Sequence, residues 1–243
     1  MNTCPPWLEA RRREHGIGAV IDHTLLRADA RLSEITRLCD EAVGLGLGQV
    51  CVNGQWVAAA VQRLARAPVR VVTVVGFPLG ASGAAAKAAE ARLAVGEGAH
   101  EVDMVMALGS AKAGRWDEVG DEITRVVGAA DGRLVRVIVE SAALTSEEIS
   151  RAARTAVAAG AGSVKTSTGF HSAGGASVEA VRLLREAVGL DTGVKASGGI
   201  RSAEQALALL RAGADRIGTS GAAGWTAVLG GAAPNLEELL AGG

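Results

Sequence analysis

Short runs rich in valine and isoleucine recur along this chain and alternate with longer stretches that carry the residue spacing of helices. The starts of these runs lie roughly 20 to 32 residues apart, which is the length of one strand–helix unit. Several of the runs are apolar throughout, a pattern typical of parallel strands that are buried on both faces. The predicted strands are Ile17–Asp22, Gln49–Val52, Val69–Val75, Glu101–Met106, Leu134–Glu140, Ser163–Thr166, Gly193–Ala196 and Asp215–Gly218.

The stretches between these runs carry helix-start signals. Thr145 and Glu148 have the residue types and spacing of a capping box, and Ser202 and Gln205 repeat that spacing. Apolar residues then recur on one face of each predicted helix. In the first long helix the predicted inward face consists of Ile35, Leu38, Cys39, Ala42 and Val43.

Eight strands that alternate with helices without a break favour a closed (β/α)8 barrel, or TIM barrel, over an open doubly wound sheet. The chain has 243 residues, and a barrel of this kind commonly fills about 250 residues as one domain. No proline-, serine- or charge-rich linker interrupts it. We therefore expect an α/β fold with a single barrel domain over residues 1–243, in which residues 1–16 form a short N-terminal extension or helix.

Charge and apolar patterning exclude several classes of partner. The formal net charge is −1 at pH 7, so the chain offers no basic field to attract nucleic acid or anionic lipid. It has no apolar run of 18 or more residues and no signal-peptide pattern at its N-terminus. We therefore expect no nucleic acid partner, no membrane partner and a cytoplasmic location.

The sequence also lacks the usual motifs for metals and nucleotide cofactors. Its three cysteines have no CxxC spacing, and its four histidines form no HxH or HExxH pair. His23, next to Asp22, is interpreted as a hydrogen-bonded structural residue. No GxGxxG motif follows the first predicted strand. We therefore expect neither a metal nor a cofactor.

Lysine is scarce in this chain, and two of its four copies fall at the ends of neighbouring predicted strands. The lysines are Lys87, Lys112, Lys165 and Lys195, among 25 basic residues. Because arginine supplies the other cations, a retained lysine is a candidate for losing its proton and attacking a carbonyl. The alternative is that the four lysines only reflect a GC-rich codon bias. In a (β/α)8 barrel the carboxyl ends of the strands carry the reactive groups, so Lys165 and Lys195 should point into one pocket.

Two lysines in one pocket favour Schiff-base chemistry. A second ammonium group and apolar surroundings both lower the pKa of a lysine, which reaches about 7–8 in favourable sites. The neutral amine then forms an iminium with a carbonyl substrate, and the iminium accepts electrons when a carbon–carbon bond is cleaved. Asp103 ends another predicted strand and is the candidate for moving protons. Its alternative role is a salt bridge that holds the two lysines in place.

Glycine-rich loops follow the seventh and eighth predicted strands, at the usual phosphate site of this fold. They are Ser197–Arg201 and Gly218–Gly221. Glycines let backbone N–H groups converge on an anion, and the helix that starts near Ser202 adds its positive end. The two loops predict a phosphorylated ligand without identifying it.

Seven motifs follow one another in the order IDHTLL (Ile21–Leu26), VCVN (Val50–Asn53), VVGFPLG (Val74–Gly80), EVDMV (Glu101–Val105), VKTSTGF (Val164–Phe170), VKASGGIR (Val194–Arg201) and RIGTSG (Arg216–Gly221). In this combination the chain resembles the deoxyribose-phosphate aldolases over nearly its whole length. Members of that family are class I aldolases with a (β/α)8 barrel. They reversibly cleave 2-deoxy-D-ribose 5-phosphate to acetaldehyde and D-glyceraldehyde 3-phosphate, in deoxynucleoside catabolism. The resemblance implies the same reaction here, with a sugar phosphate and acetaldehyde as small-molecule partners.

The resemblance also implies roles for individual residues of these motifs. Lys165 matches the Schiff-base lysine, Lys195 its pKa-lowering and proton-handling partner, and Asp103 the proton relay. Asp22 resembles a residue of the sugar pocket, and Cys51 has inert packing as its alternative role. The predicted substrate-binding residues are Asp22, Cys51, Thr166, Gly169, Gly198, Gly199, Gly218 and Ser220.

The chain departs from the pattern of relatives in three respects. Phe170 stands where some relatives have a lysine that contacts phosphate, and Ser141 stands where many have threonine. The chain also has no tyrosine, so the C-terminal tyrosine that assists proton transfer in some relatives has no counterpart here. Relatives are often dimers, which makes a homodimer a candidate assembly. Two other functions stay open: a barrel aldolase or transaldolase for another sugar phosphate, and a non-catalytic barrel that binds a sugar phosphate.

Overall fold

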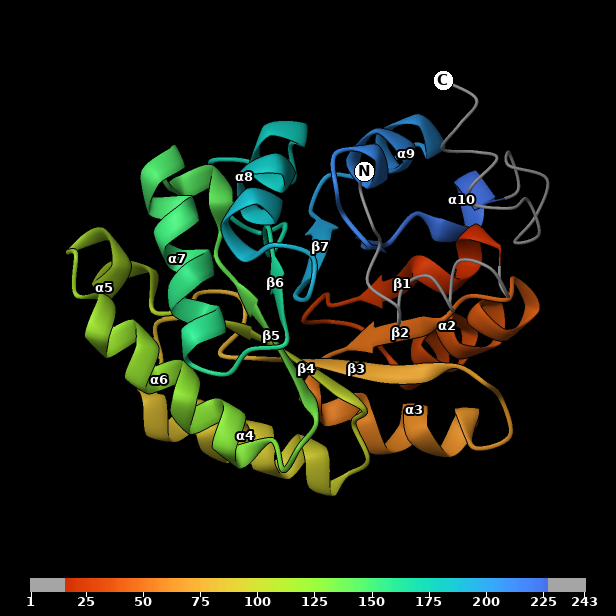
Figure 1. Cartoon of the computed structure of the whole chain (residues 1–243). Coiled ribbons are helices and arrows are strands. Elements are labelled where there is room, and N and C mark those ends of the chain that lie inside the picture. The colour runs from red at the N-terminus through yellow and green to blue at the C-terminus, as the bar shows by residue number, and fades with distance from the viewer. Residues whose placement is uncertain (1–15, 227–243) are drawn as a thin grey trace.

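Eight parallel strands close into a barrel in the computed structural model of the chain, which describes residues 16–226. Each strand pairs with the next along the chain, and β8 pairs with β1 to close the sheet (Figure 1). The predicted (β/α)8 barrel is therefore confirmed. The strands are β1 (Ile21–Leu25), β2 (Gln49–Val52), β3 (Arg70–Val75), β4 (Glu101–Val105), β5 (Leu134–Ile138), β6 (Ser163–Lys165), β7 (Gly193–Ser197) and β8 (Arg216–Thr219).

The strand boundaries agree with the sequence prediction to within two residues, except for the first strand. The prediction of Ile17–Asp22 is wrong at its start, because Ile17–Val20 forms a 3-10 helix (η1) and β1 begins at Ile21. Most residues of η1 are buried, so this apolar run reflects burial rather than strand pairing. Gly48 makes room for it, since a Cβ there would lie 2.5 Å from the Ala19 carbonyl oxygen.

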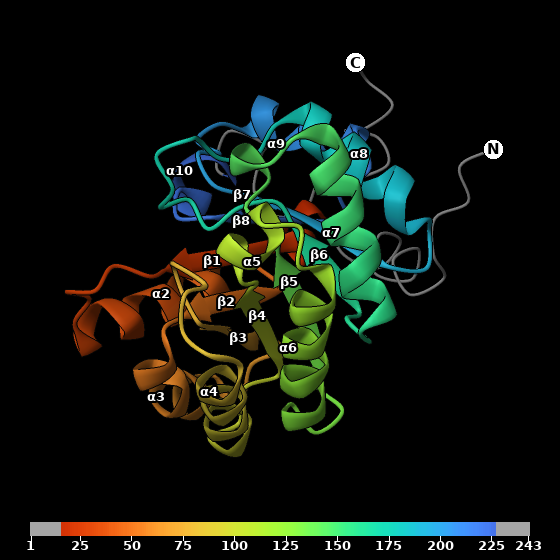
Figure 2. The same ribbon diagram turned by 90° about the vertical axis from the view of Figure 1, so that its left-hand side faces the viewer.

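Helices form an outer ring around the strands (Figure 2). Two further 3-10 helices, η2 (Gly54–Trp56) and η3 (Ser141–Ala143), follow β2 and β5. The α-helices in the described residues are α2 (Leu32–Gly44), α3 (Val57–Leu64), α4 (Ala84–Gly96), α5 (Leu108–Lys112), α6 (Trp116–Ala129), α7 (Ser146–Ala158), α8 (Val178–Val188), α9 (Ala203–Arg211) and α10 (Ala222–Thr226).

Two helix starts test the capping predictions. At the start of α7, the Glu148 amide donates to Thr145 Oγ1 at 3.2 Å and the Thr145 amide donates to Glu148 Oε2 at 2.8 Å, which confirms the capping box. At the start of α9, the Gln205 amide donates to Ser202 Oγ, but the Gln205 side chain accepts from the amide one residue before Ser202. The inward face predicted for α2 is wrong at Val43, which lies at the edge of the apolar stripe and is 49% exposed.

The barrel separates an apolar outer core from a charged interior. Between the strands and the helices lies a continuous core, built mainly of alanine, valine, leucine and isoleucine. Inside the barrel, polar side chains bond to strands that are not neighbours in the sheet: Lys195 on β7 reaches Asp103 on β4, and Gln49 on β2 reaches Glu101 on β4. The interior of a (β/α)8 barrel is ordinarily filled by branched apolar side chains. The charged interior therefore marks a candidate site.

Parts of the predicted single domain lie outside the described residues. These are residues 1–15 and 227–243, so the N-terminal extension or helix expected over residues 1–16 falls there apart from Gly16. Within residues 16–226, no helix combines the length and the apolar character that a membrane span requires.

Candidate active site

Lys165 and Lys195 stand side by side near the carboxyl ends of β6 and β7. They are direct partners in the parallel pairing of these strands, so both side chains point to the same face of the sheet. Lys165 Nζ lies 3.0 Å and Lys195 Nζ 2.9 Å from the same oxygen, Asp103 Oδ2. All three side chains are buried. The barrel thus brings together the three residues that the sequence predicts as catalytic.

The other oxygen of Asp103 is held by an arginine from β5. Arg136 Nη1 donates to Asp103 Oδ1 at 2.5 Å, and Nη2 donates to Glu101 Oε2 at 2.9 Å. Burial raises the pKa of Asp103, but the charges of Lys195, Lys165 and this arginine hold it well below its ordinary value. Asp103 is therefore a carboxylate with one oxygen fixed by a guanidinium group and the other shared by two lysines.

Lys195 is held as a cation by two carboxylates. Besides Asp103, its Nζ donates to Asp22 Oδ2, and Asp22 Oδ1 accepts from Arg216 Nη1 at 3.0 Å. Burial lowers the pKa of Lys195, but Asp103 and Asp22 raise it above its ordinary value. Lys195 therefore keeps its proton at neutral pH and presents a fixed positive charge to the neighbouring Lys165.

The sequence analysis assigned no role to four further polar residues of this network, which are Gln49, Glu101, Arg136 and Arg216, although Glu101 and Arg216 belong to two of the seven motifs. Glu101 accepts from Gln49 Nε2 at 2.6 Å and from Arg136, both inside the barrel. Burial raises the pKa of Glu101, but Arg136 and Arg216 lower it to about 2. A signal was available in the sequence: each residue is a polar side chain within a short strand that is otherwise mostly apolar. In a parallel strand buried on both faces, such a side chain needs a partner inside the barrel.

The charges of this buried network do not balance when every basic group is protonated. Arginine keeps its proton in proteins, and the pKa of Lys195 is raised. The buried members of the network are three carboxylates and four basic side chains, and the partly exposed Arg70 adds a further cation 3.3 Å from Glu101 Oε1, so the network carries excess positive charge. Its buried members are Asp22, Glu101, Asp103, Arg136, Lys165, Lys195 and Arg216.

A cavity of about 420 Å³ opens beside Lys165, between the loops that follow β1, β6, β7 and β8. The charged residues among its described lining are Arg27, Lys165 and Arg201, all of them basic. Of the three predicted catalytic residues, Lys165 is therefore the one that reaches a space suited to an anion. The predicted site residues that line this cavity are Lys165, Gly169, Gly198, Gly199, Gly218 and Ser220.

The remaining predicted substrate-binding residues, Asp22, Cys51 and Thr166, are buried and do not line this cavity. Thr166 Oγ1 donates to the Ser197 carbonyl and accepts from the Ser197 amide, both at 3.1 Å, which joins the ends of β6 and β7. Cys51 packs in an apolar cluster with Leu26 and two valines of β3, and burial raises the pKa of its thiol to about 11. Direct substrate contacts by these three residues stay predictions.

Two glycines allow a close approach of backbone and side chains around the cavity. Gly198 has a φ of +94°, and a Cβ there would lie 3.1 Å from Gly175 Cα and 3.2 Å from Gly169 Cα. A Cβ on Gly218 would lie 3.0 Å from Lys195 Cε. Glycine at position 198 therefore allows the loop after β7 to pack closely against the segment that follows β6. Glycine at position 218 leaves room for the side chain of Lys195.

One wall of the cavity is aromatic. Phe170 lines the cavity and meets Phe77 edge to face, with ring centroids 5.2 Å apart and planes at 85°. Phe77 also packs on the apolar cluster around Cys51. At the position where some relatives carry a lysine, this chain therefore places an aromatic ring.

Metal-ligand geometry is not found among residues 16–226, which contain no cluster of three or more His, Cys, Asp or Glu side chains able to hold an ion. His23 Nε2 lies 2.8 Å from Glu41 Oε2 on α2. This contact confirms the interpretation of His23 as a hydrogen-bonded structural residue, although its partner is Glu41 rather than the adjacent Asp22.

Comparisons with known proteins agree with one another. Residues 18–229 match the family described as DeoC/LacD family aldolase. A deoxyribose-phosphate aldolase from Geobacillus sp. (strain WCH70) is 52% identical over 208 residues, which are 85% of this chain and 93% of that relative. Deoxyribose-phosphate aldolase 1 of Bacillus licheniformis is 52% identical over 205 residues, 84% of this chain and 92% of the relative. The tetrameric deoxyribose phosphate aldolase of Aeropyrum pernix superposes with a TM-score of 0.79 at 32% identity, covering 91% of this chain and 89% of that one.

Proposed function

The chain belongs to the DeoC/LacD family of aldolases, among its deoxyribose-phosphate aldolases, and we propose that it cleaves 2-deoxy-D-ribose 5-phosphate through a Schiff base on Lys165. The products would be D-glyceraldehyde 3-phosphate and acetaldehyde, and the reaction is reversible. The observation that carries this proposal is the position of Asp103 Oδ2, within 3.0 Å of both lysine amines, next to a cavity that Lys165 lines.

Lys165 is the nucleophile in this proposal because it alone of the two lysines lines the cavity. Lys195 cannot take that role while two carboxylates hold its proton. Its fixed charge instead disfavours a second ammonium group beside it. The excess positive charge of the network acts in the same direction, because a neutral amine at position 165 reduces that excess.

The reaction begins when the Lys165 amine adds to C1 of the open-chain sugar and water leaves, which forms an iminium. Asp103 then accepts the proton of the 3-hydroxyl group through a water molecule. The C2–C3 bond breaks, its electron pair moves toward the iminium to give an enamine, and C3 becomes the aldehyde carbon of the departing glyceraldehyde 3-phosphate. Protonation of the enamine at C2 and hydrolysis release acetaldehyde and restore the amine.

The hydrogen bonds to Asp103 change as the reaction starts. In the free site its Oδ2 receives hydrogen bonds from both lysines. Once Lys165 has become an iminium nitrogen, it keeps only one N–H, so Oδ2 can accept a hydrogen bond from the water of the relay. Arg136 keeps the other oxygen in place, and Lys195 supports the relay as a donor.

The chemical character of the cavity supports a phosphorylated substrate. Its charged lining is basic, and the glycine-rich loops after β7 and β8 expose backbone N–H groups to it. We further propose, from the family membership, a role in deoxyribonucleotide catabolism in the cytoplasm and assembly as a homodimer. The whole chain, residues 1–243, would form one domain.

The direct test is turnover of 2-deoxy-D-ribose 5-phosphate, measured as acetaldehyde release by the wild type and by the D103N variant. We expect turnover by the wild type and a loss of about 10²–10⁴-fold in kcat for D103N, which is the usual contribution of a positioned acid–base group. Turnover with dihydroxyacetone as donor but not with acetaldehyde would favour the aldolase or transaldolase for another sugar phosphate. Binding of deoxyribose 5-phosphate without turnover would favour the non-catalytic barrel.

A further inference from the structure

The loop between β1 and α2 brings an arginine to the cavity that none of the seven motifs assigns to phosphate binding. We propose that Arg27 is the side chain that neutralises the substrate's phosphate group, with Asp29 holding its guanidinium group until the substrate arrives. This inference rests on the proposed function, because it concerns the anionic end of the same substrate.

The charge requirement of the ligand is the first argument. A phosphate monoester carries about −1.5 to −2 charges at pH 7, whereas backbone N–H groups supply only partial charges. The basic residues that line the cavity are Arg27, Lys165 and Arg201. Lys165 is committed to the aldehyde end, beside Asp103. Two arginines are therefore left for a group with nearly two charges.

The aromatic wall is the second argument. Phe170 follows the glycine of the KTSTG motif, and its ring meets Phe77 edge to face at 5.2 Å. Strand β6 and the loop after it therefore provide no cation to this part of the cavity beyond Lys165 itself. Arg27 lines the same cavity from the loop after β1, so it can supply the charge that the β6 side lacks.

The present partners of Arg27 are the third argument. Arg27 Nη1 donates to Asp29 Oδ1 at 2.8 Å, and Nη2 donates to Glu34. The Arg27 side chain is 48% exposed and that of Asp29 80% exposed. Ion pairs exposed to this degree contribute little to stability, so a phosphate can replace Asp29 at low cost. A guanidinium group also binds phosphate with two parallel N–H bonds. The phosphate carries more negative charge than the carboxylate of Asp29, so it attracts the guanidinium group more strongly.

Glu34 differs from Asp29 because it has a second task. Its Oε2 accepts from the Arg31 amide at the start of α2, at 3.0 Å. Glu34 therefore stays with the helix and continues to orient Arg27, while the contact to Asp29 is the exchangeable one.

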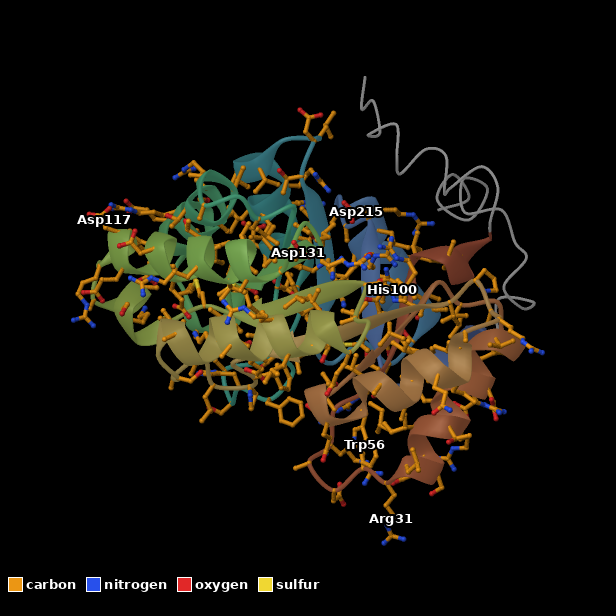
Figure 3. All side chains as sticks on the ribbon, turned by 90° about the horizontal axis from the view of Figure 1, so that it is seen from below. Arg31, Trp56, His100, Asp117, Asp131 and Asp215 are labelled. Atoms are coloured by element: carbon orange, nitrogen blue, oxygen red, sulfur yellow. The ribbon has the colours of Figure 1, made fainter. Side chains whose placement is uncertain are left out.

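The test compares two substrates that differ only at the phosphate: 2-deoxy-D-ribose 5-phosphate and 2-deoxy-D-ribose. For each protein, the ratio of kcat/KM between the phosphorylated and the unphosphorylated sugar is measured. The variants are R27Q and, as matched control, R31Q, which removes the same charge from the same loop. Arg31 does not line the cavity, and Figure 3 shows its side chain extending away from the barrel into solvent.

We expect the ratio to fall ten-fold or more in R27Q, to fall less in R27K, and to stay at the wild-type value in R31Q. The inhibition constant of inorganic phosphate should rise in R27Q in parallel. A ratio in R27Q equal to that of the wild type, or an equal fall in R27Q and R31Q, would overturn the role of Arg27. A wild type that turns over neither sugar would instead refute the proposed function. In that case the binding of inorganic phosphate to the wild type and to R27Q would be measured by direct titration instead of by inhibition. Binding equal in both proteins would overturn the inference in that case as well.

Discussion

Lys165 and Lys195 are register partners on β6 and β7, and their amines lie 3.0 and 2.9 Å from one oxygen of Asp103. The two lysines are nevertheless unlike. Lys195 also bonds Asp22 and is buried away from the cavity, whereas Lys165 lines it. In the proposed mechanism, one lysine therefore serves as a fixed charge and the other as the reacting group.

Replacing Lys195 should impair the reaction at Lys165. A K195M variant loses both the fixed positive charge of Lys195 and its hydrogen bond to Asp103, while the contact between Lys165 and Asp103 stays. We expect turnover at pH 7 to fall by about 10²-fold or more. K112M, which removes an exposed lysine paired with Glu148, is the control. Turnover by K195M equal to that of the wild type would contradict the assigned role.

Adding a methyl group beside Lys195 should disturb the site without unfolding the barrel. In a G218A variant the new Cβ would lie 3.0 Å from Lys195 Cε and 3.1 Å from Ser197 Cβ, so the lysine must move. A misplacement of about 1 Å costs about 10²-fold in rate, and the smaller shift needed here should cost about 10-fold. We expect that fall in kcat with the melting temperature nearly unchanged. G44A, where a Cβ meets nothing within 4 Å, is the control and should retain both.

We expect Lys87, which the proposed mechanism does not use, to contribute to stability. It is fully buried on α4, where its Nζ bonds Glu122 and donates to the carbonyls of Gly80 and Val105, both at 2.8 Å. A K87M variant leaves the Glu122 carboxylate buried without its cation, which should lower the free energy of unfolding by about 3–5 kcal/mol. The double variant K87M/E122L should recover much of that loss in urea unfolding. A double variant as unstable as K87M would contradict this account.

The buried carboxylates predict acid sensitivity with a definite sign. The pKa of Glu101 is about 2 in the folded protein and ordinarily 4.5. A lowered pKa contributes stability that is fully present above the ordinary value and is lost as the pH falls from about 4.5 toward 2; the shift corresponds to the order of 3 kcal/mol. Urea unfolding measured between pH 5 and pH 3 should therefore show a steeper decline for the wild type than for E101Q. Parallel declines would contradict the ionised state of Glu101.

Much of the fold and of the reacting trio could be predicted from sequence. The apolar runs of parallel strands have a strong signal, and Lys165, Lys195 and Asp103 are charged residues within such runs. The prediction that Asp103 ends its strand is wrong, because Asp103 lies in the middle of β4. The exception at Ile17–Val20 shows the limit of that signal, because an apolar run reports burial and does not by itself distinguish a strand from a short 3-10 helix.

The residues that hold the three predicted catalytic side chains in place were harder to predict. Arg136 and Arg216 lie inside strands, and no short motif reports that their partners are Asp103 and Asp22, which come from distant parts of the chain. Lys87 illustrates the same point, since its partner Glu122 is 35 residues away. Such pairs depend on the register and closure of the barrel, which a single sequence does not specify at this level of detail.

The most direct test of the central claim is borohydride reduction of the wild-type protein in the presence of acetaldehyde, followed by peptide mapping. The neutral amine at position 165 forms an imine that borohydride reduces to a stable secondary amine. We predict one modified lysine, Lys165, and loss of that adduct in K165R. An adduct on Lys195 or on another lysine, or no adduct at all, would contradict the assignment.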